Sequence, residues 1–360
     1  MIKYFSSLGK LKLPDFIIAG AMKSGTTYLH YILNEHEKIF IPLEETGFFD
    51  IDDIEQHLDF FILNSDQWIT LDYEKHLSEY LLWYTSFFED SNQGQMIGED
   101  STTYMASEKA PSRIKELIPN VKLIFIMRDP VERAYSHYWH LVRIGRTFYN
   151  FEKTLQYRPE RLLQRSFYKR QVERYKKYFL SGNMKYIIFE EFIKSPQKII
   201  DEILDFLGLD KKIDVKSINV HKNPAKIPVN LGLYMIFNRI FKIQNNYIYH
   251  LPIKSNLLVY KNSKLFDSFV RRCLKFIERI KYLKFSNRAQ NLLIKHKYPF
   301  DFYEVFKKAF DEINLTYKRK YPPMKTKTRN FLEKLFIMEN RGLSEIINKD
   351  LKKYWPYMKE

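Results

Sequence analysis

The sequence has little cysteine and no long apolar run, and both absences narrow the classes of protein that it can encode. A single cysteine, Cys273, excludes an intramolecular disulfide and a cysteine-based zinc cluster, which fits a reducing compartment. The histidines form no His-Glu-x-x-His pair and no aspartate-rich loop has calcium spacing, so no metal is implied. The longest apolar stretches, such as residues 231–243, are interrupted by charges and are too short to span a membrane. Because the N-terminus also has no apolar run of signal-peptide length, we expect a cytoplasmic protein.

Positive charge is distributed unevenly along the chain. The formal net charge is +16, and residues 222–329 contain 24 Lys and Arg but only 6 Asp and Glu. Segments such as 269–283 place apolar residues at helical spacing with cations between them, which predicts basic amphipathic helices. A solvated basic face, an anionic membrane surface and an acidic polymer are the alternatives for this region. No nucleic-acid-binding module is recognisable, so nucleic acid is not an expected partner.

The apolar segments predict a mostly parallel, doubly wound α/β sheet. Strand candidates are residues 16–19, 95–98, 123–127 and 185–189, with helical stretches between them. Basic helical patterning interrupts this rhythm at about 230–320. We therefore expect a single domain over 12–360 that carries a basic, mainly helical insertion or cap.

A glycine-containing turn follows the first predicted strand. Gly20 and Gly25 keep the four-residue gap of a nucleotide P-loop, in which backbone N–H groups surround a phosphate at a helix N-terminus. A Walker A loop has its lysine directly after the second glycine, whereas Thr26 holds that position here and Lys23 precedes Gly25. The turn therefore predicts an anion-binding loop without the ATP–Mg²⁺ signature.

This turn resembles the 5′-phosphosulfate loop of sulfotransferases that use 3′-phosphoadenosine 5′-phosphosulfate (PAPS). A second segment, residues 122–139, resembles the 3′-phosphate motif of that family: a strand, an arginine and a helix with Pro130 near its first turn. The resemblance implies that Arg128 and Ser136 hold the 3′-phosphate, the arginine through bidentate bonds. It implies a 5′-phosphosulfate set of Lys23, Ser24, Gly25, Thr26 and Thr27.

The resemblance covers most of the chain. Residues 166–209 look like the central block of the family, and residues 322–355 look like the tail of bacterial sulfotransferases related to heparan-sulfate enzymes. The resemblance is weakest at about 230–320. It implies a hydroxyl acceptor, most often on a carbohydrate, and it makes Lys226, in a basic loop over the nucleotide, a further candidate ligand for PAPS.

Sulfuryl transfer to an alcohol requires a base for the acceptor proton and a cation for the charge on the departing phosphate. Residues 44–49 resemble the Lys-Glu-x-His-Phe-Phe segment of carbohydrate sulfotransferases, whose glutamate is the proposed base. The resemblance thus implies Glu45 as the base, and Lys23 is our choice for the cation. The sequence departs from that segment twice, because Glu44 replaces a lysine and Gly47 replaces a histidine.

Residues 98–104 resemble the loop that lines the acceptor cleft in relatives. Asp100 stands where several relatives carry lysine, so a cationic contact to an acidic sugar is lost and Asp100 becomes a reserve base. We expect PAPS-dependent sulfation of a hydroxyl, without a metal. The alternatives are a P-loop kinase of small molecules and a non-enzymatic binder of an acidic polymer or membrane surface through residues 222–329.

Overall fold

The computed structural model describes residues 11–57, 62–64, 67–215, 227–240, 310–316 and 321–358. Lys226 and Cys273 lie outside the described residues, as does most of the basic segment 222–329. The expectations about that segment, including its helices and its contact with a membrane or polymer, therefore stay predictions.

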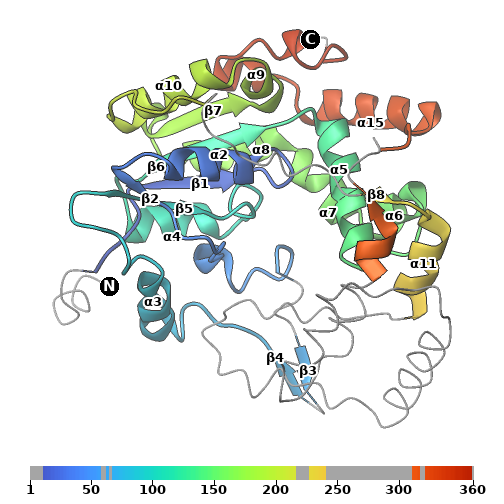
Figure 1. Cartoon of the computed structure of the whole chain (residues 1–360), viewed down its shortest axis with the longest axis horizontal. Helices are drawn as coiled ribbons and strands as arrows, with labels where there is room; N and C mark the ends of the chain where they lie inside the picture. The colour runs from blue at the N-terminus through green and yellow to red at the C-terminus, as the bar shows by residue number, and fades with distance from the viewer. Residues whose placement is uncertain are drawn as a thin grey trace.

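A five-stranded parallel sheet forms the centre of the fold, in the order β2-β5-β1-β6-β7 (Figure 1). Its strands are β1 (Phe16–Gly20), β2 (Ile39–Phe40), β5 (Met96–Asp100), β6 (Lys122–Met127) and β7 (Met184–Ile188). The four strands predicted from the sequence are present with ends that differ by at most two residues, and the predicted α/β class is confirmed. The sequence did not predict β2, because two residues are too few to show a periodic pattern.

Each face of the sheet has its own apolar core, because successive side chains of a strand point to opposite faces. Ile17 and Ala19 of β1 join a cluster with α4 (Ala110–Leu117) and α8 (Tyr168–Lys176). Phe16 and Ile18 join a second cluster with α2 (Thr26–Asn34) and α10 (Pro196–Leu207). Helices therefore cover both faces, as a doubly wound sheet requires (Figure 1).

Other elements surround this sheet. The helices are α3 (Leu77–Ser86), α5 (Pro130–Arg143), α6 (Phe151–Tyr157), α7 (Pro159–Leu162), α9 (Phe189–Lys194), α11 (Leu231–Ile240), α15 (Thr326–Glu339) and α16 (Leu343–Ile347). Short 3₁₀ helices are η1 (Phe48–Asp50), η3 (Gln164–Ser166), η4 (Ser181–Asn183) and η6 (Leu351–Lys353). Two antiparallel pairs join β3 (Ile62–Asn64) to β4 (Gln67–Ile69) and β8 (Ile227–Pro228) to β9 (Leu315–Thr316).

The β8–β9 pair brings together residues on either side of the segment 241–309. The Val229 N–H donates to the Asn314 carbonyl at 2.7 Å, next to the paired strands. The described residues on either side of this segment also meet at the Phe237 and Phe310 rings, which stack with centroids 4.1 Å apart, and both β8 and α11 contact α5. In the described ranges, no helix combines the length and the apolar character needed to cross a bilayer. The expected cytoplasmic location stays a prediction.

Candidate active site

A cavity of about 880 Å³ lies where the parallel strands end. Its lining includes the loops after β1 and β5, Arg128 after β6 and Phe189 after β7, and it continues along α5. Ligands of doubly wound sheets bind at this edge. Lys23, Glu45 and Ser136, which are far apart in the sequence, share the cavity with Arg128.

The loop after β1 presents the N-terminus of α2 to the cavity. Gly25 precedes the helix with φ +92°, and a Cβ there would lie 2.7 Å from Cε2 of Phe189, so the position requires glycine. The first turn of a helix leaves its N–H groups without intrahelical acceptors, and that of α2 contains no acidic residue. Gly25, Thr26 and Thr27 line the cavity. The arrangement suits an anion.

Lys23 and Ser24 differ in their access to the cavity. Lys23 lines it, and burial, followed by the charge of Arg143, lowers the pKa of Lys23 to about 8 although Glu45 acts in the opposite direction. Ser24 belongs to the same loop but is fully buried, and its backbone N–H donates to the Ala21 carbonyl at 3.2 Å. The Ser24 side chain is therefore not on the cavity surface, unlike the rest of the predicted 5′-phosphosulfate set.

Arg128 joins the two predicted anion-binding motifs. Its guanidinium donates to the Lys23 carbonyl at 3.3 Å and lies 5.0 Å from the centre of the Phe189 ring. The Tyr168 hydroxyl donates to the Arg128 carbonyl at 2.9 Å. Ser136 is buried on α5 and also lines the cavity. The structure therefore brings Arg128 and Ser136 to one cavity, and their role in holding a 3′-phosphate stays a prediction.

The C-terminal tail fixes the turn that carries Arg128. The Asp129 side chain caps α5, because it accepts from the N–H groups of the first turn, and burial raises its pKa to about 6. The Asp129 N–H donates to Glu190 Oε1 at 3.0 Å, and the Trp355 indole donates to Glu190 Oε2 at 3.0 Å. The Tyr357 hydroxyl donates to Asp129 Oδ1 at 3.2 Å.

Glu45 is held on the wall of the cavity by the loop after β5. Its Oε2 accepts from the Thr102 hydroxyl at 2.8 Å and from the Thr102 N–H at 3.3 Å. Glu45 is an exposed residue that lines the cavity. Desolvation by the surrounding protein, followed by the charge of Asp100, raises the pKa of Glu45 to about 7, against the opposing effects of Thr102 and Lys23. A carboxylate with a pKa near neutrality suits general base catalysis.

Asp100 lies behind this wall instead of on it. It is buried at the end of β5, and its Oδ2 is 3.6 Å from Nδ1 of His30 on α2. It is not part of the cavity lining, and burial raises its pKa. Of the two carboxylates considered as the base, Glu45 is the one that faces the cavity, and Asp100 acts on it through charge.

Glu99 ties the Glu45 segment to the sheet. This fully buried carboxylate accepts from Thr46 at 2.6 Å, Ser101 at 2.8 Å, Tyr104 at 2.6 Å and Tyr84 at 2.6 Å. The Thr46 bond ties the residue after Glu45 to β5. The position of the candidate base therefore depends on a carboxylate in the core.

Sequence reasoning missed a group of cations that also line the cavity. These residues are Arg143, Arg146, Arg161 and Arg165. The spacing of Ser136, His140 and Arg143 on α5 is a helical one, and this signal could have identified Arg143. The remaining arginines follow no motif.

Burial, followed by neighbouring cationic side chains, holds the pKa values of His137 and His140 well below the usual range, so both are neutral.

Comparison with known proteins assigns the class. Residues 14–213, more than half of the chain, match the family model described as "Sulfotransferase family". The chain belongs to the sulfotransferase family, which confirms the resemblance found in the sequence. No group of three or more potential metal ligands is present within the described ranges.

Several of the curated proteins that this chain resembles are heparan sulfate enzymes. The chain is 30% identical over 212 residues to mouse (Mus musculus) bifunctional heparan sulfate N-deacetylase/N-sulfotransferase 4, covering 55% of this chain and 22% of that protein. It is 28% identical over 221 residues to mouse heparan sulfate glucosamine 3-O-sulfotransferase 3B1, covering 59% and 50%. The chain thus spans half or less of these relatives. A solved sulfotransferase from Alicyclobacillus acidocaldarius is 26% identical, with a TM-score of 0.48, and the match covers 69% of this chain and 100% of that one.

We expect Glu45 to titrate near pH 7 in the free protein, and its pKa to fall in Asp100→Asn. The substitution removes the negative charge that disfavours ionisation of Glu45, while Lys23 and Thr102 remain in place. Carboxyl ¹³C chemical shifts measured against pH test this, with Glu45→Gln to assign the resonance. An unchanged Glu45 midpoint in Asp100→Asn would contradict the coupling.

Proposed function

We propose that this protein transfers a sulfuryl group from PAPS to a hydroxyl group of a carbohydrate. The observation that carries the proposal is the convergence of two anion-binding motifs and a carboxylate with a raised pKa on one cavity. Family membership supports the same reaction class. The heparan sulfate relatives favour a glycan acceptor.

The donor would occupy the side of the cavity between α2 and α5. Lys23, Gly25, Thr26 and Thr27 are suited to the 5′-phosphosulfate, since a helix N-terminus and a cation meet there. Ser24 contributes to the shape of the loop through its bond to the Ala21 carbonyl. Arg128 and Ser136 are suited to the 3′-phosphate. Lys226, the remaining candidate ligand, lies outside the described residues.

The reaction requires one proton transfer and one displacement at sulfur. Glu45 accepts the proton of the acceptor hydroxyl while the acceptor oxygen forms a bond to sulfur. The bond between sulfur and the bridging phosphate oxygen breaks, and adenosine 3′,5′-bisphosphate leaves. Lys23 meets the negative charge that develops on the leaving phosphate. Glu45 and Lys23 interact electrostatically, because the charge of each shifts the pKa of the other.

The charge of the cavity favours an acidic carbohydrate. Lys23 and Arg128 are assigned to the donor, and four further arginines line the same cavity. Only Glu44 and Glu45 oppose them among the lining side chains of the described residues. The lysine that several relatives carry in place of Asp100 is absent here, and the arginines of α5 and of the residues that follow it supply positive charge to the cavity instead. A uronate or a sulfated sugar matches this lining.

The family match argues against the P-loop kinase that the sequence left as an alternative. Such a kinase requires a lysine after the second loop glycine, and Thr26 occupies that position. Dependence on Mg²⁺ and ATP distinguishes the two activities.

Adenosine 3′,5′-bisphosphate should bind without Mg²⁺, and 5′-AMP, which lacks the 3′-phosphate, should bind far more weakly. Arg128→Ala should weaken binding of the bisphosphate by about 10- to 100-fold, since charge-assisted hydrogen bonds to a phosphate are lost. Calorimetric titration measures both effects. Arg170→Ala, which removes an exposed arginine of α8 that pairs with Glu339, is the matched control. Equal affinity for the two nucleotides would overturn the donor assignment.

Glu45→Gln should retain affinity for the bisphosphate and lose sulfuryl transfer by about 10²- to 10⁴-fold, because the amide cannot accept the acceptor proton. Transfer of radiolabelled sulfate from PAPS to de-O-sulfated heparin measures the loss. Glu44→Gln removes the neighbouring carboxylate, is the matched control and should change the rate by less than about tenfold. Full turnover by Glu45→Gln would exclude Glu45 as the base.

A further inference from the structure

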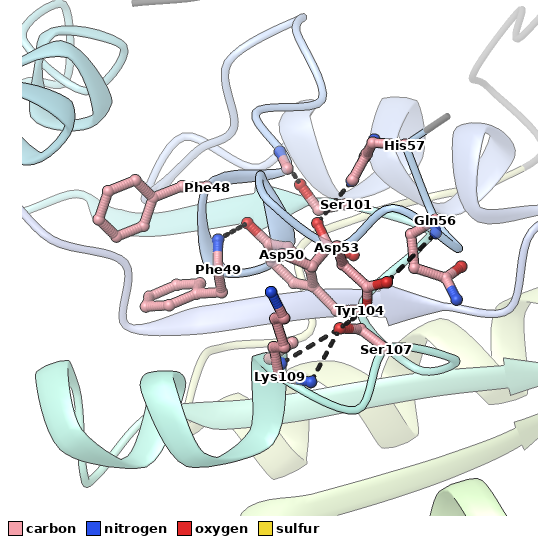
Figure 2. A network of polar contacts seen from close by, with 12 residues as sticks. Phe48, Phe49, Asp50, Asp53, Gln56, His57, Ser101, Tyr104, Ser107 and Lys109 are labelled. Carbon is pink, nitrogen blue, oxygen red and sulfur yellow. Dashed lines mark hydrogen bonds and ion pairs between the residues drawn. The ribbon is translucent and has the colours of Figure 1, made fainter. Parts of the chain in front are cut away.

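A carboxylate–imidazole pair borders the cavity beside Glu45. Nε2 of His57 lies 2.7 Å from Oδ1 of Asp50 (Figure 2). The Asp50 side chain is fully buried, whereas the His57 side chain keeps 11% of its surface and lines the cavity. A buried carboxylate that binds one imidazole nitrogen fixes the orientation of the ring and the nitrogen that carries its proton.

The His57 ring lies in tight contact with the place where a Cβ at position 47 would stand. Gly47 has φ +59°, and a Cβ built on it would lie 3.1 Å from Cε1 and 3.3 Å from Nε2 of His57. The same Cβ would lie 3.5 Å from Oδ1 of Asp50. Gly47 is the position where the similar segment of carbohydrate sulfotransferases carries histidine. In this chain, an imidazole reaches the same place from ten residues further along the sequence.

The turn that delivers His57 is held by several hydrogen bonds. The Asp53 N–H donates to the Asp50 carbonyl and the His57 N–H donates to the Asp53 carbonyl, both at 2.8 Å. Oδ1 of Asp53 accepts from the Glu55 N–H at 3.1 Å, and Oδ2 accepts from the Ser107 hydroxyl at 2.8 Å. Ser107 in turn accepts from N–H groups at the start of α4 (Figure 2). The ring therefore sits on a fixed support.

His57 and Glu45 belong to the same wall. The Gly47 N–H donates to the Ser101 hydroxyl at 3.1 Å, and the residue after Ser101, Thr102, binds the Glu45 carboxylate. The loop after β5 thus holds both the candidate base and the backbone against which His57 packs. On the other side, Arg165 donates to the carbonyl of Gln56, next to His57, at 3.3 Å.

We propose that His57, oriented by Asp50, contacts the carbohydrate acceptor next to Glu45 and takes the place of the histidine that this chain lacks at position 47. The assignment rests on the proposed function. His57 is then a residue that positions the acceptor hydroxyl and contributes to acceptor specificity, and Asp50 acts through His57. The donor site, formed by the loop after β1 and by Arg128, does not include either residue.

The test measures the effect of each variant on turnover of the acceptor separately from its effect on binding at the donor site. We expect His57→Gln and Asp50→Asn to lower kcat/KM for de-O-sulfated heparin by about 10- to 100-fold, as loss of a positioning hydrogen bond implies. The dissociation constant for adenosine 3′,5′-bisphosphate should stay within about twofold, because no donor contact is removed. His76→Gln, which replaces a half-exposed histidine before α3, is the matched control.

His57→Ala provides a second measurement, because it opens a space beside Gly47 on the cavity. Added imidazole should restore acceptor turnover in a saturable manner without changing the affinity for the bisphosphate. Parallel losses of thermal stability, bisphosphate affinity and turnover, without rescue, would reduce His57 to a structural role and overturn the assignment.

The outcomes also separate this assignment from the proposed function. If the wild-type protein transfers sulfuryl groups to the polysaccharide and His57→Gln does so at the same rate, only the role of His57 would be overturned. Wild-type protein that binds the bisphosphate but moves no sulfuryl group to the polysaccharide would overturn the acceptor proposed above, and the role of His57 with it.

Discussion

The cavity depends on a buried carboxylate, Glu99, that is held by hydroxyl groups. Burial raises the pKa of Glu99, and hydrogen bonds from Thr46, Ser101, Tyr104 and Tyr84 oppose this effect and compensate for the loss of water. A buried acceptor with several donors is costly to leave unpaired, so the segments that supply the donors are held together. Those segments are the Glu45 loop, the loop after β5 and α3. One core interaction therefore places the wall that carries Glu45 and supports His57.

The donor side relies on a different constraint, the geometry of parallel strands. The strands β1 and β6 are neighbours, so the loops that follow them open side by side, and Arg128 reaches the carbonyl of Lys23. The anion site is formed by a helix N-terminus that needs little side-chain chemistry. The C-terminal segment then fixes the turn after β6 that carries Arg128. Glu190 accepts from the Asp129 N–H of that turn and from the indole of Trp355, which lies more than 160 positions further along the chain. Trp355 and Tyr357 thus contribute to the position of a cavity that neither of them lines.

The sequence predicted four of the five strands of the sheet and the two loops that open onto the cavity, because their signals are local. A buried strand, a glycine turn and a helix start within about fifteen residues depend on neighbouring φ and ψ values and on burial, as at Phe16 to Tyr28. The buried place of Ser24, the contact between Asp100 and His30, and the arginines after α5 were not predictable in this way. Each depends on which side chains meet after the sheet is assembled, and a single sequence does not record such pairings.

The departures from the family pattern show how far a motif can be interpreted without geometry. A missing lysine at Asp100 and a missing histidine at Gly47 both suggest a weakened acceptor site when the sequence is considered alone. In space, the cavity carries additional arginines, and an imidazole lies against Gly47. Substrate recognition requires a charge or a hydrogen-bonding group at a place, and the chain can supply that group from any segment that reaches the place. A glycine at position 47 suits this arrangement, because its φ of +59° disfavours a side chain and a Cβ there would lie only 3.1 Å from the His57 ring.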